Sequence, residues 1–264
     1  MIKFFRHIRK SLLMENKTSK YFKYAIGEII LVVIGILIAL QINNWNVEKN
    51  DNEYVSLMLK EIYYDLSDDY RIIYEGIEPR LRKMQLSINK IKEFMMNGKA
   101  PSDSIFMDYY KNMQIGISLT QRTGTFESLK LGGLNKLKND SLRTMLLEFY
   151  ESDIHRFVIF ITEYDDYIYE KIGALEPDIF SFKFIAINDS ITVHKKYPKN
   201  NEYLHHQSLH KIFNLIMEDA KNKEFRLAAF KKKYDKIMRM IERELEKRKT
   251  PFNYFDTSAL KPDF

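Results

Sequence analysis

Three side chains that ligate divalent metals recur at helical spacing near residue 206. Glu202, His206 and His210 stand at positions i, i+4 and i+8, with His194 and His205 nearby. A carboxylate and neutral imidazoles on one helix face could bind zinc or another divalent ion. Residues eight apart cannot easily share one ion, and no second acid follows His206 as in a metalloprotease helix. We therefore interpret these residues as surface histidines and keep a metal site as the alternative.

Two acidic clusters offer the paired carboxylates that acid–base catalysis or calcium binding would use: Asp65, Asp68 and Asp69, and Glu163, Asp165 and Asp166. Each cluster lies opposite or beside an apolar helical stripe, where a solvated surface is expected. Arg122 and Thr123 precede a predicted short helix and could line a groove. The chain has no cysteine, phosphate-binding loop or nucleophile elbow, so we expect neither an enzyme nor a cofactor.

One apolar stretch is long enough to cross a bilayer. Residues 25–42 are interrupted only by Glu28 and Gln41, and Tyr24 and Trp45 place an aromatic ring near either interface. A transmembrane helix needs about 20 mostly apolar residues. The run is too long for a cleaved signal peptide and lacks a small-x-small cleavage site, so an uncleaved signal-anchor is predicted.

The basic residues indicate how this span is oriented. Seven of the 42 lysines and arginines precede it, against the single acid Glu15, which predicts a cytoplasmic N-terminus and an outer C-terminal domain. The remainder of the chain is nearly neutral, and its mixed charges argue against nucleic-acid binding. Apolar and basic residues alternate at helical spacing over the first dozen positions, which predicts an amphipathic helix on an anionic leaflet.

One face of the span carries the features of a membrane contact. Gly35 and Ala39 form a small-xxx-small pair, and Glu28 lies seven residues before Gly35. Such a pair lets two helices approach closely, and an ionisable group in a membrane is a functional candidate. We expect either a homodimer through Glu28, Gly35 and Ala39 or, alternatively, a snorkelling glutamate beside ordinary small residues.

Helical periodicity continues beyond the span. Apolar residues recur at a mean interval of about 3.6 from Val55 to Met95, so one long helix is predicted, bent near Gly76 by Pro79 but not ended. Further helices are expected over 102–115, over 125–133, behind Asn139 to about 172, over 202–219 and over 222–249. Residues 176–201 break the pattern and could form a small β-hairpin that turns around Asn188 and Asp189.

The predicted fold is therefore all-α, with one transmembrane helix followed by an antiparallel helical bundle. The expected segments are a basic cytoplasmic flank (1–23), a signal-anchor helix (24–45), an outer bundle (46–250) and an irregular tail (251–264).

Two blocks carry a resemblance. YAIGEIILVVIGILIALQINNWN (24–46), with the basic MIKFFR leader, resembles a large family of bacterial single-span proteins known only as a domain of unknown function. The second block is TFESLKLGGLNKLKNDSLRTMLLEFY (125–150), with its glycine pair, Asn139 opening the next helix, and the aromatic pair Phe149 and Tyr150. The resemblance implies a bacterial inner-membrane protein with a helical periplasmic domain. It implies no activity.

Three functions fit this sequence. The first is a non-enzymatic interaction or ligand-sensing module whose partners are the bilayer, an unknown membrane or periplasmic protein, and a second copy. The alternatives are a membrane-tethered metal-binding protein or hydrolase, using Glu202, His206 and His210, and a structural spacer. A spacer is favoured if the long helix is straight and the bundle has no pocket.

Overall fold

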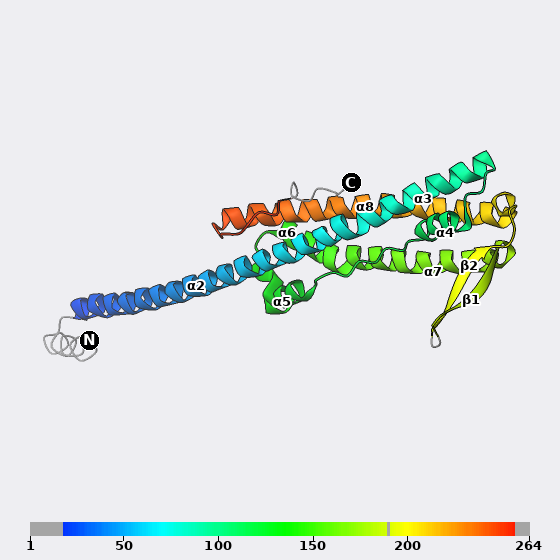
Figure 1. Ribbon diagram of the computed structural model, residues 1–264. Coiled ribbons are helices and arrows are strands. Elements are labelled where there is room, and N and C mark those ends of the chain that lie inside the picture. The colour runs from blue at the N-terminus through cyan, green and yellow to red at the C-terminus, as the bar shows by residue number, and fades with distance from the viewer. Residues whose placement is uncertain (1–17, 189–190, 257–264) are drawn as a thin grey trace. The chain divides into compact units, whose positions relative to one another are not determined.

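The protein is described by a computed structural model that covers residues 18–188 and 191–256. It is mainly helical, with one antiparallel pair of strands, and this confirms the predicted fold class (Figure 1). The elements are α2 (Thr18–Arg71), the π-helix η1 (Ile72–Ile77), α3 (Glu78–Asn97), α4 (Asp103–Asn112), α5 (Gly124–Gly133), the 3-10 turn η2 (Leu134–Lys136), α6 (Asp140–Glu148), the π-helix η3 (Phe149–Asp153), α7 (Ile154–Ile179), β1 (Phe180–Asn188), β2 (Ile191–Pro198), the 3-10 turn η4 (Tyr203–His205) and α8 (Gln207–Lys247). The chain divides into two compact units, Met1–Val55 and Ser56–Phe264.

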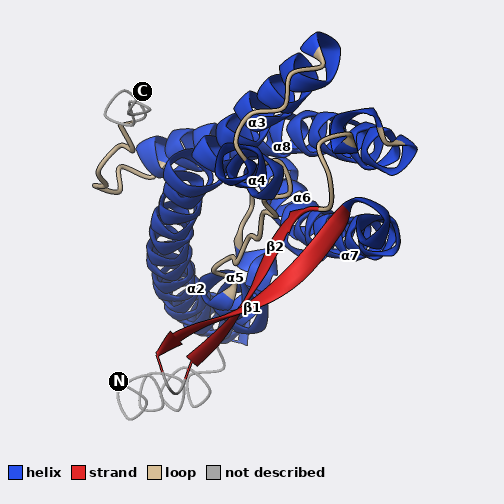
Figure 2. Ribbon diagram, turned by 45° about the vertical axis from the view of Figure 1, so that its right-hand side comes forward, coloured by secondary structure: helices blue, strands red, loops and turns tan. Residues whose placement is uncertain are grey.

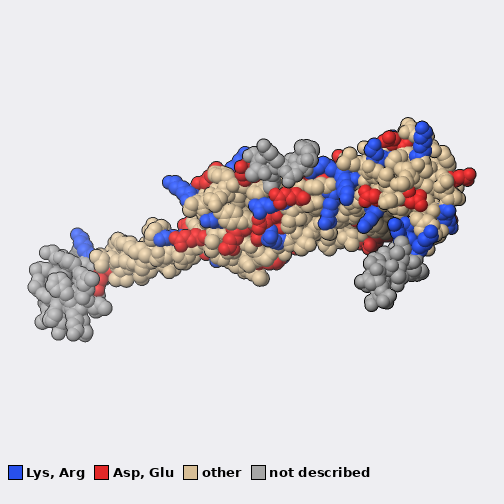
Figure 3. Space-filling model, in the orientation of Figure 1, with Lys and Arg blue, Asp and Glu red and all other residues tan. Residues whose placement is uncertain are grey.

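The first unit consists, as far as it is described, of the N-terminal part of α2. Its apolar residues are exposed on every side of the helix, for example Ile29, Ile34 and Leu37. None of the most apolar 18-residue window is buried, and the helix is long and apolar enough to cross a membrane. This stretch is almost free of charged groups in the space-filling view, whereas acidic and basic groups are interspersed over the visible face of the bundle (Figure 3). The predicted amphipathic helix over the first dozen residues lies outside the described residues.

The predicted bend near Pro79 takes the form of a π-helical turn. Pro79 has no N–H to donate to the carbonyl four residues earlier, so the regular helical ladder cannot pass through it. The helix widens instead, and the N–H of Glu78 donates to the carbonyl of Ile73, five residues back. The apolar stripe therefore stays in phase on both sides of the turn. Apart from the half-buried Met95, its members in the second unit are buried, namely Leu59, Ile62, Leu66, Tyr70, Ile73, Ile77, Leu81, Met84, Ile88 and Ile91.

The helices that follow begin and end near their predicted positions. The left-handed Gly133 (φ +114°) is the last residue of α5, which ends at the glycine pair as predicted. Asn139 caps α6, because its side-chain oxygen accepts the N–H of Leu142 at 3.1 Å. The predicted helix behind Asn139 is divided by η3 and continues as α7 through Pro177 to Ile179. It is therefore longer than expected.

The β-hairpin is confirmed. Strands β1 and β2 pair antiparallel, with Phe180 opposite Pro198 and Lys183 opposite Lys195, and the register becomes irregular between Ala186 and Asn188. The hairpin extends away from the ends of α7 and α8 in both ribbon views (Figure 2). The expected turn residue Asp189 lies outside the described residues.

The C-terminal helix corrects two predictions. A single helix, α8, replaces the two helices expected over 202–219 and 222–249, and it begins at Gln207 rather than Glu202. The buried stripe passes through the expected break without interruption, from Ile216 through Ala220 and Lys223 to Leu227. The mixed polar sequence at 219–222 contains no glycine or proline, so nothing in it ends a helix.

The core of the second unit is formed by buried side chains of α3, α7, α8 and the C-terminal part of α2, with further ones from α4, α5 and α6. Helices α3 and α7 both run antiparallel to α8 (Figure 1), and Phe157 of α7 stacks on Phe230 of α8 with ring centroids 4.2 Å apart. The described tail after α8 is irregular, as predicted. It nevertheless crosses back to α2, where the N–H of Phe255 donates to the Tyr63 hydroxyl at 2.9 Å.

Asn139 can be substituted to test the polar contact that joins α6 to α8. Besides capping α6, its amide donates to Glu244 of α8 at 2.9 Å. We expect Asn139→Ala to lower the free energy of unfolding by about 2 kcal/mol, since it removes a helix cap and leaves a buried carboxylate short of a donor. The melting temperature should fall by about 4–8 °C in thermal denaturation. The exposed Asn135→Ala is the matched control, and an equal loss from both variants would contradict this role.

Candidate functional site

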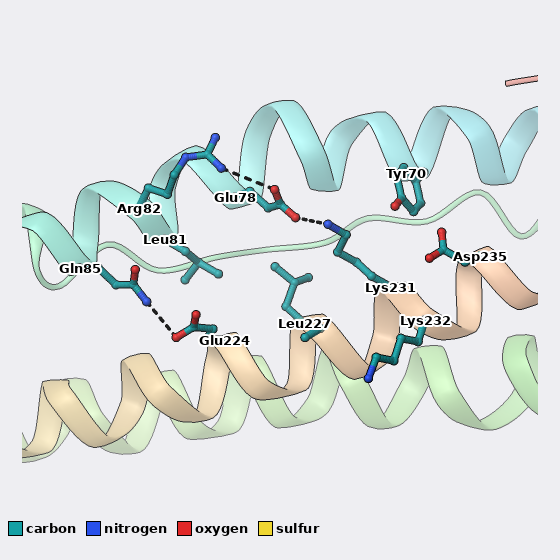
Figure 4. Close-up of a pocket in the computed structure, with 11 residues that line it drawn as sticks. Tyr70, Glu78, Leu81, Arg82, Gln85, Glu224, Leu227, Lys231, Lys232 and Asp235 are labelled. Atoms are coloured by element: carbon teal, nitrogen blue, oxygen red, sulfur yellow. Dashed lines mark hydrogen bonds and ion pairs between the residues drawn. The ribbon is translucent and has the colours of Figure 1, made fainter. Parts of the chain in front are cut away.

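An open groove of about 470 Å3 lies between α3 and α8, just beyond the π-helical turn (Figure 4). Tyr70 of α2 stands at one end of it, and Gln85 of α3 and Glu224 of α8 stand at the other. Leu81 and Leu227 form its apolar middle. This volume falls in the range of small-molecule sites, about 300–1,000 Å3. Pro79 and η1 bend the helix directly beside the groove, and π-turns recur at functional sites.

One carboxylate in the groove is shared between two cations. Glu78 forms an ion pair with Lys231 of α8 and a second one with Arg82, 3.6 Å away on its own helix. The Lys231 ammonium also lies 5.8 Å from the ring centre of Tyr70 and 5.5 Å from that of Tyr74. These contacts hold the groove wall and leave this group with a net positive charge.

Three other charges lining the groove have no ionic partner. Within residues 18–188 and 191–256, Glu224, Lys232 and Asp235 form no ion pair; Glu224 accepts only the neutral amide of Gln85, at 2.9 Å. Burial, reinforced by the nearby Asp235 carboxylate, raises the pKa of Tyr70 to about 12. The groove thus presents separate positive and negative centres around an apolar middle. This arrangement suits the binding of a small charged ligand.

A second polar cluster joins α2 to the loop before α5. Asp65 accepts the hydroxyl of Thr125 at 2.6 Å, Asp68 pairs with Arg122 at 3.2 Å, and Asp69 accepts the backbone N–H of Arg122 at 3.2 Å. The predicted acidic cluster therefore holds a loop in place and is not the solvated surface expected from its position beside the stripe. Arg122 and Thr123 were expected to line a groove. They are not among the residues that line the groove between α3 and α8.

Asp69 is the most perturbed carboxylate of that cluster. Its side chain is 2% exposed, and its Oδ1 has no hydrogen-bond partner, with the Arg122 guanidinium 3.7 Å away. Burial raises its pKa to about 6, against the lowering effect of the Arg122 N–H and guanidinium. Burial, with the nearby Asp69 charge, also raises the pKa of Tyr234.

The second acidic cluster is divided. Glu163 and Asp166 are exposed, whereas Asp165 turns inward to Lys223, which is 3% exposed. Lys223 also donates to Asp219 at 2.7 Å. Burial raises the pKa of both carboxyls, against the lowering effect of the lysine between them. The arrangement is a buried charge network that joins α7 to α8, in which each charge is compensated by a neighbour.

The helix face on which the alternative of a metal site depended does not form. Glu202 and His206 both precede the first residue of α8, so the three side chains are not successive turns of one helix. His206 is the N-cap, and its Nδ1 accepts the N–H of Ser208 at 3.2 Å. In the described part of the chain, no three His, Cys, Asp or Glu side chains are grouped so that they could hold a metal ion.

The three residues expected to form a membrane contact lie on one helix. Glu28, Gly35 and Ala39 lie on the apolar part of α2, at spacings that bring them to one side of the helix. A Cβ added at Gly35 would meet no atom within 4 Å.

Sequence reasoning missed the groove entirely. The charged residues that line the groove belong to polar helix faces, which the sequence predicts to be solvated. Pro79 is the one signal in the sequence that marks this part of the long helix as irregular.

Asp69 predicts a pH dependence of stability. Because its folded-state pKa (about 6) exceeds the ordinary value of 3.8, the folded protein holds a proton that the unfolded chain has already released. Stability should therefore decrease as the pH rises from about 4 to about 6, by an amount on the order of 2–3 kcal/mol. Asp69→Asn should remove this slope and raise the melting temperature at pH 7.5. Thermal denaturation between pH 4 and 8 would measure both.

The exposed Asp68→Asn is the control for that series and should keep the slope. If the wild type and Asp69→Asn responded equally to pH, Asp69 would not be the titrating group.

The family comparison agrees with the resemblance of the two sequence blocks. A family of unknown function, DUF6090, matches residues 28–194, which include the apolar part of α2, one wall of the groove and the Asp69–Arg122 cluster. No curated protein and no solved structure matches the chain significantly. Because the match covers more than half of the chain, the protein belongs to the DUF6090 family.

Proposed function

We propose that this protein is a membrane-anchored, non-enzymatic module that senses a ligand or binds a partner through its helical bundle. The observation that carries the proposal is the contrast between the two units. The first exposes an apolar helix on every side, while the second buries its apolar stripes and carries an open, charged groove. A helix that is apolar all round needs a nonpolar environment, and a bilayer supplies it.

The orientation belongs to the same proposal. The basic flank before α2 favours a cytoplasmic N-terminus, with the bundle on the periplasmic side of a bacterial inner membrane. The groove and the π-helical turn count against a simple spacer, since a spacer needs neither. The metal-binding alternative loses its geometric support, because Glu202 and His206 lie outside α8.

A homodimer through α2 is the accompanying proposal. Gly35 and Ala39 would allow close approach of two helices, and Glu28 lies on the same side. The open space around Gly35 makes this contact easy to test, because a larger residue there clashes with nothing in its own chain.

Topology can be measured directly, because the chain contains no cysteine. In intact cells, a membrane-impermeant maleimide should label Leu131→Cys, whose parent side chain is 88% exposed. It should label Ser11→Cys, in the N-terminal flank, only after the inner membrane is opened. The opposite pattern would overturn the orientation, and partitioning of the full chain into the soluble fraction would overturn the anchor.

Cross-linking in native membranes tests the assembly. We expect a cross-linked homodimer or a reproducible partner, with Gly35→Ile lowering the dimer yield severalfold because a bulky side chain separates the helices. Gly27→Ile is the matched control, since Gly27 has equally open surroundings but lies about 80° around the helix from Gly35. If cross-linking recovered only the single chain, and if Gly35→Ile and Gly27→Ile gave the same result as the wild type, both the dimer and a stable partner would be contradicted.

A further inference from the structure

We propose that residues 113–123, the segment between α4 and α5, form a strap that closes on the bundle while Asp69 carries a proton and opens when that proton is lost. The strap runs from α4 to α5 without helix or strand (Figure 1). The inference goes beyond the proposed function, since it concerns how the bundle itself is regulated. It is carried by three observations: how the strap is fastened, what it buries and how incompletely Asp69 is paired.

Side chains fasten the middle of the strap, and a backbone ladder does not. In the described part of the chain, residues 117–121 form no backbone–backbone hydrogen bond. The Gln121 amide donates to the Tyr234 hydroxyl of α8 at 3.3 Å, and the N–H of Arg122 donates to Asp69 of α2 at 3.2 Å. A segment with few backbone hydrogen bonds opens at a lower free energy than the whole domain. The strap can therefore open while the helices stay packed.

A separate contact holds each end of the strap. Near its start, the backbone carbonyl of Gln114 accepts the hydroxyl of Tyr169 of α7 at 2.7 Å. Just beyond its end, the hydroxyl of Thr125 donates to Asp65 of α2 at 2.6 Å. Neither contact uses Asp69, so a change at Asp69 acts on the residues between these two points.

The closed strap buries apolar side chains. Ile117 and Leu119 of the strap are 5% and 8% exposed, and Tyr234, to which Gln121 donates, is fully buried. Opening the strap would bring its apolar side chains into contact with water. The exposure of Leu119 therefore distinguishes the open strap from the closed one.

The closed strap compensates the charge of Asp69 only in part. Within the described residues, Asp69 and Asp219 are the two carboxylates with a buried oxygen that has no hydrogen-bond partner. Asp219 pairs through its other oxygen with the Lys223 ammonium at 2.7 Å, whereas Asp69 accepts one backbone N–H and lies 3.7 Å from the Arg122 guanidinium. A buried carboxylate without full compensation is costly. Proton loss therefore favours the open strap, in which water reaches Asp69.

The groups that face Asp69 leave it as the one that titrates near neutral pH. They are Asp65 and Asp68 of α2, Arg122 of the strap, Tyr150 of η3 and Tyr234 of α8. Burial raises the pKa of Asp69 to about 6, against the lowering effect of Arg122. Burial also raises the pKa of both tyrosines, so they stay neutral. The contribution of Asp69 to closure is complete below about pH 4 and is lost as the pH rises through about 6.

The test is thiol labelling of the purified full chain in detergent, because the chain has no cysteine of its own. Leu119→Cys places a reporter in the strap, and Ile117→Cys is a second one. Each rate of labelling by a maleimide is divided by that of the urea-unfolded chain at the same pH, which removes the effect of pH on the thiol. We expect the normalised rate to rise about tenfold from pH 5 to pH 7, since opening returns the pKa of Asp69 from about 6 to 3.8.

Two substitutions in the Leu119→Cys chain identify the titrating group. Asp69→Asn should bring the ratio of the rates at pH 7 and pH 5 close to one, whereas the exposed Asp68→Asn should keep it about tenfold. No rise between pH 5 and pH 7 in the Leu119→Cys chain would overturn the proposal. A rise that persisted unchanged in Asp69→Asn would overturn it as well.

A third reporter separates opening of the strap from unfolding of the bundle. Ile241→Cys lies at a fully buried position of α8 and should react at least tenfold more slowly than Leu119→Cys at pH 7. Equal rates for these two reporters would mean that only unfolding of the whole bundle exposes them, and the strap would be contradicted. These results leave the membrane anchor and its partners untested, so the proposed function stands or falls separately.

Discussion

The bundle depends on one apolar stripe that runs from Leu59 along α2, through the π-helical turn and down α3. The buried residues of this stripe share one face of the long helix, and α3 contacts α4 and α8; the residues can share that face only while the period of the helix is maintained. Pro79 interrupts the regular hydrogen bonding of the helix because it has no N–H to donate. The helix continues through one widened π-helical turn and does not end there. The groove lies directly beside this turn, so the widened helix that accommodates the proline and the opening on the surface occur at one place.

Polar contacts then connect the helices that the stripe brings together. Asp65 and Asp69 hold the loop before α5, Asn139 joins α6 to α8, and Lys223 joins α8 to α7. Each pairing leaves a charge or an amide with little access to water, where an unpartnered group is costly. These contacts therefore specify how the helices are joined more than they add to stability. Asp69 is the exception, since its compensation is incomplete and its pKa rises.

Much of the architecture could be predicted because helices are encoded locally. The apolar stripe, the cap at Asn139, the end of α5 at Gly133 and the hairpin all followed from short-range patterns. The errors also have local causes. The break expected near 220 fell in a polar stretch without any helix breaker, and the start expected at Glu202, on which the alternative of a metal site depended, lies five residues before α8 begins. His206 instead uses its ring nitrogen to cap the helix.

The sequence by itself determined the apolar helix, the apolar stripe that continues along it and the charge asymmetry around the apolar stretch. These properties depend only on residue type and spacing within one segment. Tertiary structure alone decided that Asp69 is buried, that Lys223 lies between two carboxylates and that Glu224 and Lys232 line one groove with Leu81. The physical reason is that burial and charge pairing depend on which helix faces meet. The Asp69–Arg122 contact joins residues 53 positions apart and the Gln85–Glu224 contact residues 139 positions apart, and no local period records such pairs.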